Sequence, residues 1–247
     1  MMVGDRTGWH KAFKAGDAAQ CVAVMHRAWT ELVAASPETF RPGEKEHHLT
    51  ELLCQYLADT RASTRLTGLW SYENHQGRLD RKNPKGMVVT QRKRTDIRYF
   101  SNREDPALNL IFEFKKLDHR KTARDGYISE GMLRFITGEY SIGQPLALMV
   151  GILTIHRNDT LPALHQWLDS PDAKSLLFME TLKTGQRRVP SAFFEQAAFD
   201  TEHLRPCDKA PSHGTIVISH LFLDFPDLPR TAKSRSRRQT TSDALEG

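Results

Sequence analysis

The sequence is poor in cysteine and contains no long apolar run. Its three cysteines, Cys21, Cys54 and Cys207, are scattered without zinc-ligand spacing, and their odd number does not suggest a disulfide framework. The longest apolar run, Pro145 to Ile155, is too short to span a bilayer. The N-terminus lacks an apolar signal core, so we expect a cytoplasmic protein with no membrane partner.

Cofactor and nucleophile motifs are also absent. The sequence has no P-loop, no Gly-rich dinucleotide fingerprint and no serine elbow, so any ATP-driven step would need a partner protein. What the chain does have is a basic balance, with 35 Lys and Arg against 30 Asp and Glu and a net charge of +5. This excess favours a polyanionic partner, nucleic acid first and an anionic membrane surface second. An ordinary solvated surface would give the same balance.

Hydrophobic periodicity predicts an α/β protein. The expected helices lie at 17–35, 44–59 and 124–140, the last ending near Gly138, and from Asn158 or Asp159 onward with Pro162 in the first turn. The expected strands lie at 65–72, 87–100, 108–114, 146–155 and 215–225. A polar loop is expected at 74–86, and helix and loop at 172–199. This order predicts a central mixed β-sheet flanked by helices.

The length of 247 residues suits one large domain with a small extension. We expect an N-terminal helical extension over 1–43 and a main domain over 44–228. The last segment, 229–247, is rich in Ser, Thr, Arg and Lys with almost nothing apolar, so a disordered basic tail is expected there.

The residues that suggest chemistry lie at the end of the apolar strand 108–114. Glu113 and Lys115 are two apart, so both side chains leave the same face of a strand. A buried carboxylate or ammonium is costly unless it is paired or bound to a metal. If the strand carrying Asp96 pairs with this one, two carboxylates meet and their repulsion invites a divalent cation. A metal-bound water could attack a phosphodiester, with Lys115 orienting or deprotonating it.

These residues resemble the PD-(D/E)xK, or restriction-endonuclease-like, nuclease superfamily. Glu113, Phe114 and Lys115 match its (D/E)xK element and Asp96 matches its upstream aspartate, while Thr95 stands where the name-giving pattern has proline. The resemblance covers roughly residues 44–155 and includes the element order. It implies a restriction-endonuclease-like core in which Asp96 and Glu113 bind Mg²⁺, with Mn²⁺ as a second option, and Lys115 assists catalysis.

Many members of the superfamily also carry a glutamate on the first core helix. Glu46 is the better candidate, because it shares a helix face with Thr50 and Leu53, and Glu51 is the second candidate. The resemblance therefore adds Glu46 to the catalytic and metal-binding set.

The competing interpretation of this set is structural. Asp96 and Glu113 would then be strand-end charges paired with Arg98 and Lys115.

Basic residues near this set are candidates for nucleic-acid contacts. They are Arg134, Arg94, Lys116 and Lys93. Arg134 could instead pair with Glu130 one helical turn away, and basic loops could be merely solvated. His220, on an alternating strand, is more often a satisfied structural histidine than a catalyst.

The function implied by the resemblance is a Mg²⁺-dependent endonuclease. DNA is favoured over RNA as the substrate because most of the superfamily cuts DNA, and size and layout suggest bacterial defence against phage or foreign DNA. The expected partners are DNA, an ATPase, helicase or other defence-system subunit, and a second copy in a homodimer. The alternative is a catalytically inactive nucleic-acid-binding or interaction subunit of a defence or repair complex.

Overall fold

The computed structural model describes residues 15–61, 64–80, 88–103, 107–179, 187–206, 208, 210 and 214–230. For 74–80 and 88–93 it describes the backbone and not the side chains. Most of the expected disordered tail, the basic residues at 81–87 and Cys207 lie outside the described residues.

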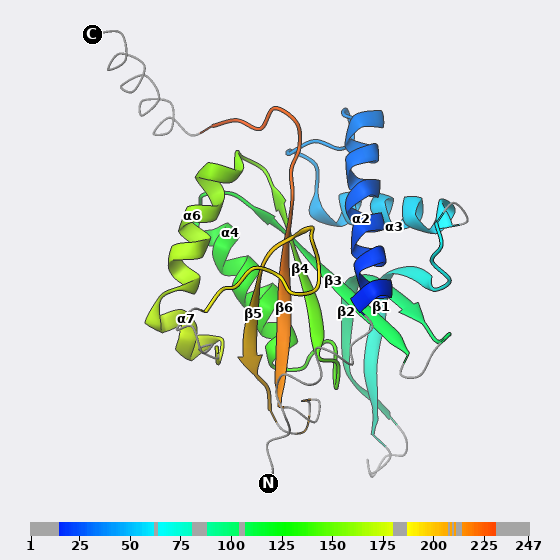
Figure 1. Cartoon of the computed structure of the whole chain (residues 1–247), viewed down its shortest axis with the longest axis vertical. Coiled ribbons are helices and arrows are strands. Elements are labelled where there is room, and N and C mark those ends of the chain that lie inside the picture. The colour runs from blue at the N-terminus through cyan, green and yellow to red at the C-terminus, as the bar shows by residue number, and fades with distance from the viewer. Residues whose placement is uncertain are drawn as a thin grey trace.

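A six-stranded mixed sheet forms the centre of the molecule (Figure 1). Its strands, in spatial order, are β1 (Leu69–Asp80), β2 (Val88–Ser101), β3 (Leu108–Leu117), β4 (Leu146–Leu153), β6 (Thr215–Leu223) and β5 (Ala197–Leu204). The first three are antiparallel, β4 runs parallel to β3 and to β6, and β5 is antiparallel to β6. Parallel neighbours need crossover connections, and helices supply them here. The predicted α/β class and mixed sheet are confirmed.

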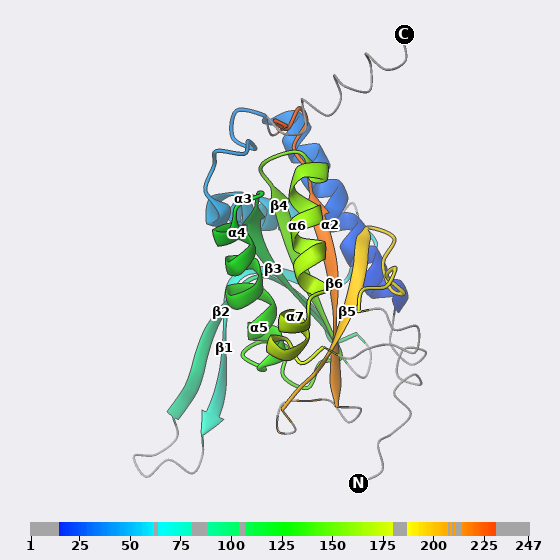
Figure 2. The same cartoon turned by 90° about the vertical axis from the view of Figure 1, so that its left-hand side faces the viewer.

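Helices cover both faces of the sheet (Figures 1 and 2). One face carries α2 (Ala15–Ala35) and α3 (Glu46–Asp59), and the other carries α4 (Lys121–Gly126), the π-helix η2 (Tyr127–Met132), α5 (Leu133–Ile136), α6 (Arg157–Leu168) and α7 (Pro171–Leu176). Each layer has its own apolar cluster, and both clusters draw on β3 and β4. Among the described residues, no helix combines the length and apolarity needed to cross a membrane.

The alternation of β3 decides where its charged residues point. Phe112 and Phe114 belong to the cluster under α2 and α3, whereas Ile111 and Leu117 belong to the cluster under η2 and α6. Side chains on a strand alternate between faces, so Glu113 and Lys115, which lie two and four residues after Ile111, face the η2 layer. β4 and β6 are buried at every residue because helices cover both of their faces, which explains their near-continuous apolar sequences.

Several sequence predictions were wrong at element boundaries. The expected loop at 74–86 was wrong over 74–80, because this polar segment continues β1 and its backbone pairs with β2 as far as Asp80↔Val88 (Figure 2). Strand β5 was not predicted, because AAFDTEHL has too many polar residues to read as a strand. The predicted start of α6 was also wrong: His156 is the N-cap and accepts a hydrogen bond from the Asn158 amide, so Pro162 lies inside the helix rather than in its first turn.

The expected helix at 124–140 is divided into three parts. It begins as α4, widens into η2 and closes with α5, which ends at Ile136. Gly138 follows with a φ of 69°, a left-handed conformation that glycine adopts without steric cost, so the predicted helix end is confirmed.

Candidate active site

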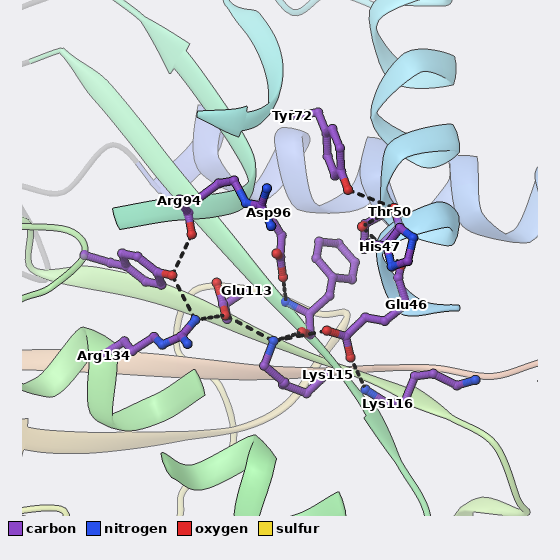
Figure 3. A network of polar contacts seen from close by, with 12 residues as sticks. Glu46, His47, Thr50, Tyr72, Arg94, Asp96, Glu113, Lys115, Lys116 and Arg134 are labelled. Carbon is purple, nitrogen blue, oxygen red and sulfur yellow. Dashed lines mark hydrogen bonds and ion pairs between the residues drawn. The ribbon is translucent and has the colours of Figure 1, made fainter. Parts of the chain in front are cut away.

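The end of the β2–β3 ladder brings two carboxylates together. The β2–β3 pairing ends with Ile97 opposite Phe112, and the next residues along the two strands are Asp96 and Glu113. Beyond that pair, the side chain of Asp96 bonds to the β3 backbone: its Oδ2 accepts a hydrogen bond of 2.8 Å from the backbone N–H of Phe114 (Figure 3). Strands β2 and β3 therefore place Asp96 and Glu113 next to each other on one face of the sheet.

Lys115 lies at the centre of the cluster (Figure 3). Its Nζ is 3.1 Å from Glu46 Oε1, 3.2 Å from Glu113 Oε1 and 2.8 Å from the Phe114 carbonyl oxygen. Burial alone would lower the pKa of Lys115, but Glu113, Glu46 and Asp96 together raise it above its ordinary value. The ammonium group therefore keeps its proton at neutral pH and acts as a hydrogen-bond donor.

Glu113 is the most unusual group in the site. Its side chain is 1% exposed, and burial, with a smaller contribution from Asp96, raises its pKa to about 8. Oε1 is engaged by Lys115 and by Arg134, but Oε2 is buried and has no hydrogen-bond partner among the described residues. A buried carboxylate oxygen without a partner is costly, and such an exception is often explained by a ligand or ion.

Asp96 shares this environment. Burial is the largest influence on its pKa and raises it, against the lowering effects of Lys115 and of the Phe114 amide. Asp96 and Glu113 therefore each resist carrying a negative charge, because burial disfavours the charged form more than the nearby cations favour it.

Glu46 connects the first turn of α3 to the end of β3. While Oε1 accepts from Lys115, Oε2 accepts a hydrogen bond of 2.7 Å from the backbone N–H of Lys116. The ammonium of Lys116 in turn donates to the carbonyl oxygens of Pro42 and Glu44 at 2.6 and 2.7 Å. Lys116 thus fastens the segment before α3 to β3, and a nucleic-acid contact by this residue would compete with these two bonds.

Arg134 and Tyr140 hold the opposite side of Glu113. Arg134 NH1 lies 3.3 Å from Glu113 Oε1 and donates to the Tyr140 hydroxyl at 3.1 Å. The Tyr140 hydroxyl, which is almost fully buried, donates to the backbone carbonyl of Arg94 at 2.6 Å. Arg134 therefore forms its ion pair with Glu113 rather than with Glu130, and the Tyr140 hydroxyl connects Arg134 to the backbone of β2.

The π-helix brings this side of the site close to the sheet. Gly131 in η2 lies so near Met149 of β4 that a Cβ atom there would come within 2.5 Å of Met149 Cε and 3.7 Å of Lys115 Cγ. A residue without a side chain lets the helix approach the stem of Lys115. π-Helical turns occur frequently at functional sites.

The remaining basic candidates have different surroundings. Arg94 pairs with Glu73 at 3.0 Å and its side chain is 58% exposed, whereas the side chain of Lys93 lies outside the described residues. Arg98 directs its Nε to Asn109 Oδ1 at 2.7 Å and not to Asp96. The structural interpretation of the charged set was therefore wrong for the Asp96–Arg98 pair, whereas the Glu113–Lys115 ion pair is present.

Two residues that shape the candidate site could not be predicted from the sequence. Tyr140 gives no local signal, because its hydroxyl reaches residues that are distant in the chain. Arg205 is 6% exposed and donates to the backbone carbonyls of Tyr140 and Ser141 at 2.9 and 2.8 Å. A lone arginine after a strand gives no sequence signal that it fixes another segment.

His220 is a satisfied structural histidine, as predicted. It is fully buried, its Nδ1 lies 2.8 Å from the Tyr127 hydroxyl, and its Nε2 lies 2.9 Å from Thr201 Oγ1. Burial keeps its pKa well below the ordinary value, so the ring is neutral.

The donor set suits a hard divalent cation. Asp96 and Glu113 offer carboxylate oxygens, and the unpartnered Oε2 of Glu113 is the donor most in need of a positive charge. Within the described residues, no three His, Cys, Asp or Glu side chains are grouped closely enough to hold a metal by themselves. A cation here would therefore depend on two carboxylates and on water or substrate oxygens, which is the usual coordination of Mg²⁺.

Comparison of the chain with protein-family models, with curated proteins and with solved structures gives no match.

Proposed function

We propose that this chain is a metal-dependent nuclease that hydrolyses phosphodiester bonds of DNA on a restriction-endonuclease-like core. The observation that supports it is the convergence of Glu46, Asp96 and Glu113 on Lys115, from a helix and two strands. Three acids and one lysine, with one buried carboxylate oxygen left unpartnered, form an arrangement suited to a cation and a phosphate rather than to stability alone.

In this proposal, Asp96 and Glu113 would hold Mg²⁺ or Mn²⁺, which would supply an acidified water and neutralise charge on the phosphate. Lys115, which is protonated, donates a hydrogen bond to a phosphate oxygen and stabilises the charge that develops there. Glu46 orients the lysine through its 3.1 Å contact, and Arg134 holds Glu113 from the other side. Each of these residues thus binds, orients or stabilises, and none needs to form a covalent intermediate.

The test is nicking of supercoiled plasmid by purified protein with Mg²⁺ or Mn²⁺. Lys115→Ala is the site variant, and Lys174→Ala, which removes an exposed lysine from α7, is the matched control. We expect metal-dependent nicking by the wild type and by Lys174→Ala, and a loss of at least a hundredfold in Lys115→Ala, typical for removal of one charge-stabilising donor. Cutting that persists in Lys115→Ala or in EDTA would place the activity elsewhere.

A second candidate is a catalytically inactive nucleic-acid-binding or interaction subunit. The observation that favours it is that Lys115 already neutralises Glu46 and Glu113 by direct contact, as in a structural ion-pair cluster. Calorimetric titration with Mn²⁺ separates the two candidates, because the nuclease requires a site that Glu113→Gln weakens. The defence role, the ATPase or helicase partner and the homodimer stay predictions from the resemblance.

A further inference from the structure

A row of side chains continues from the carboxylates along one face of β2. Ile97 and Tyr99 are buried in the cluster under α2 and α3, whereas Asp96, Arg98 and Phe100, which alternate with them, are only half-buried. Alternation therefore places these three on the same face of the sheet as Glu113. Arg98 is the first residue in this row after the candidate metal ligand.

Arg98 has a fixed orientation and no counter-charge. Asn109 Oδ1 accepts from its Nε at 2.7 Å, and the guanidinium lies 4.9 Å above the centre of the Phe100 ring. Both partners are uncharged, and in the described part of the chain no carboxylate pairs with this arginine, whereas Arg94 and Arg134 each contact a glutamate. An anion could therefore bind this arginine without displacing an ion pair, and it would offset the partial desolvation of the guanidinium.

The position of Arg98 suits one particular anion. Residues two apart on a strand project from points about 7 Å apart, which is comparable to the separation of neighbouring phosphates along a nucleic-acid strand. We propose that Arg98 binds the backbone phosphate next to the one that is cleaved at Asp96 and Glu113. This inference rests on the proposed nuclease function. Because Asn109 engages Nε alone, the terminal amino groups are the part of the guanidinium that meets the phosphate oxygens.

The assignment is tested by binding of a fluorescein-labelled duplex and of the corresponding single strand in EDTA, over about 50 to 200 mM salt. Arg98→Gln removes the charge, and Arg98→Lys keeps it but lacks the planar group that Asn109 and Phe100 orient. Arg27→Gln is the matched control, because Arg27 is an exposed arginine on α2, on the other side of the sheet. Thermal unfolding of each variant establishes that it is folded.

We expect Arg98→Gln to bind about tenfold more weakly, as for the loss of one charge-assisted hydrogen bond. The slope of log affinity against log salt should fall by about 0.9 for a duplex or about 0.7 for a single strand, as for one lost phosphate contact, and a purely structural role would leave this slope unchanged. Arg98→Lys should keep most of the slope, and Arg27→Gln should match the wild type. A wild-type slope in Arg98→Gln, or no binding by the wild type, would overturn the assignment.

Cleavage of the same duplex with Mg²⁺ separates this inference from the proposed function. If the slope falls in Arg98→Gln but the wild type cuts nothing, the phosphate site stands and the nuclease proposal fails. If the wild type cuts and Arg98→Gln keeps both its KM and its salt slope, the nuclease proposal stands and the phosphate site fails.

Discussion

Glu113 should make the fold less stable as the pH rises. Burial raises its pKa from the ordinary value of 4.5 to about 8. A group whose pKa is higher in the folded state holds its proton more tightly there, so its contribution is most favourable below pH 4.5 and is lost as the pH rises to 8. Glu113→Gln, which resembles the protonated acid in shape, removes this dependence.

The size of the effect follows from the shift. A change from 4.5 to about 8, at about 1.4 kcal/mol for each pKa unit, corresponds to on the order of 5 kcal/mol between the two limits. Roughly 3 kcal/mol of this should already be lost at pH 6.5, because the unfolded chain is then fully ionised at this position. The difference in the free energy of unfolding between Glu113→Gln and the wild type should therefore grow in favour of the variant from pH 5 to pH 8.

The assay is urea unfolding in EDTA at several pH values, followed by the fluorescence of the buried Trp29 and Trp70. Taking the difference between two proteins cancels the titration of all other groups. Glu51→Gln, at an exposed position on α3, controls for the amide substitution itself. A difference curve that stays flat from pH 5 to pH 8 would refute the assignment of Glu113 as a destabilised buried carboxylate.

A cation should reverse the effect. Adding Mn²⁺ at about a hundredfold excess over its dissociation constant should stabilise the wild type by about 2.7 kcal/mol and should stabilise Glu113→Gln much less. Equal stabilisation of the two proteins would mean that the metal binds elsewhere.

Three further predictions concern neighbouring groups. Lys115→Met should lower the free energy of unfolding at pH 8 by about 3 kcal/mol, because it leaves Glu113 without its central cation, and an unchanged urea midpoint would contradict this. Tyr140→Phe removes two partly buried hydrogen bonds and should cost about 1–3 kcal/mol and weaken Mn²⁺ binding, whereas Tyr127→Phe, as a matched control, should reduce stability alone. His203, whose pKa burial lowers to about 4, stabilises the fold above pH 6.5, and about 3 kcal/mol should be lost between pH 6.5 and 4. His203→Gln should flatten that loss in urea unfolding, and an undiminished loss would assign it to other groups.

Hydrophobic pattern predicted the elements that form the interior and failed for the polar ones. The apolar runs of β3, β4 and β6 were recognisable because burial on both faces requires them. β5 and the far half of β1 were missed because their sequences are mostly polar, whereas pairing with a neighbouring strand places their backbones in the sheet. Such pairing depends on residues that are distant in sequence, which no local window contains.

The candidate site was predictable where spacing fixes geometry. The separation of two between Glu113 and Lys115 places both on one face of any strand, and Glu46 was favoured over Glu51 from its helix face, in agreement with its contact to Lys115. The roles of Tyr140 and Arg98 could not be predicted in this way. Tyr140 acts through a backbone carbonyl on another strand, and Arg98 has no carboxylate partner among the described residues, a property that only the three-dimensional arrangement reveals.

The cluster has features that stability alone does not explain. A fold selected for stability alone would do better with an apolar residue at position 113, because a buried ion pair often contributes no more than a well-packed hydrophobic side chain. Here the chain instead keeps Glu113 buried, leaves Oε2 without a partner and sets Asp96 close enough to raise the Glu113 pKa further. A bound cation would turn the same repulsion into attraction, and an adjacent phosphate would supply the charge that Arg98 lacks. Glu113 Oε2 and the Arg98 guanidinium therefore call for partners of opposite charge on one face of β2 and β3, and a metal-bound phosphodiester would supply both.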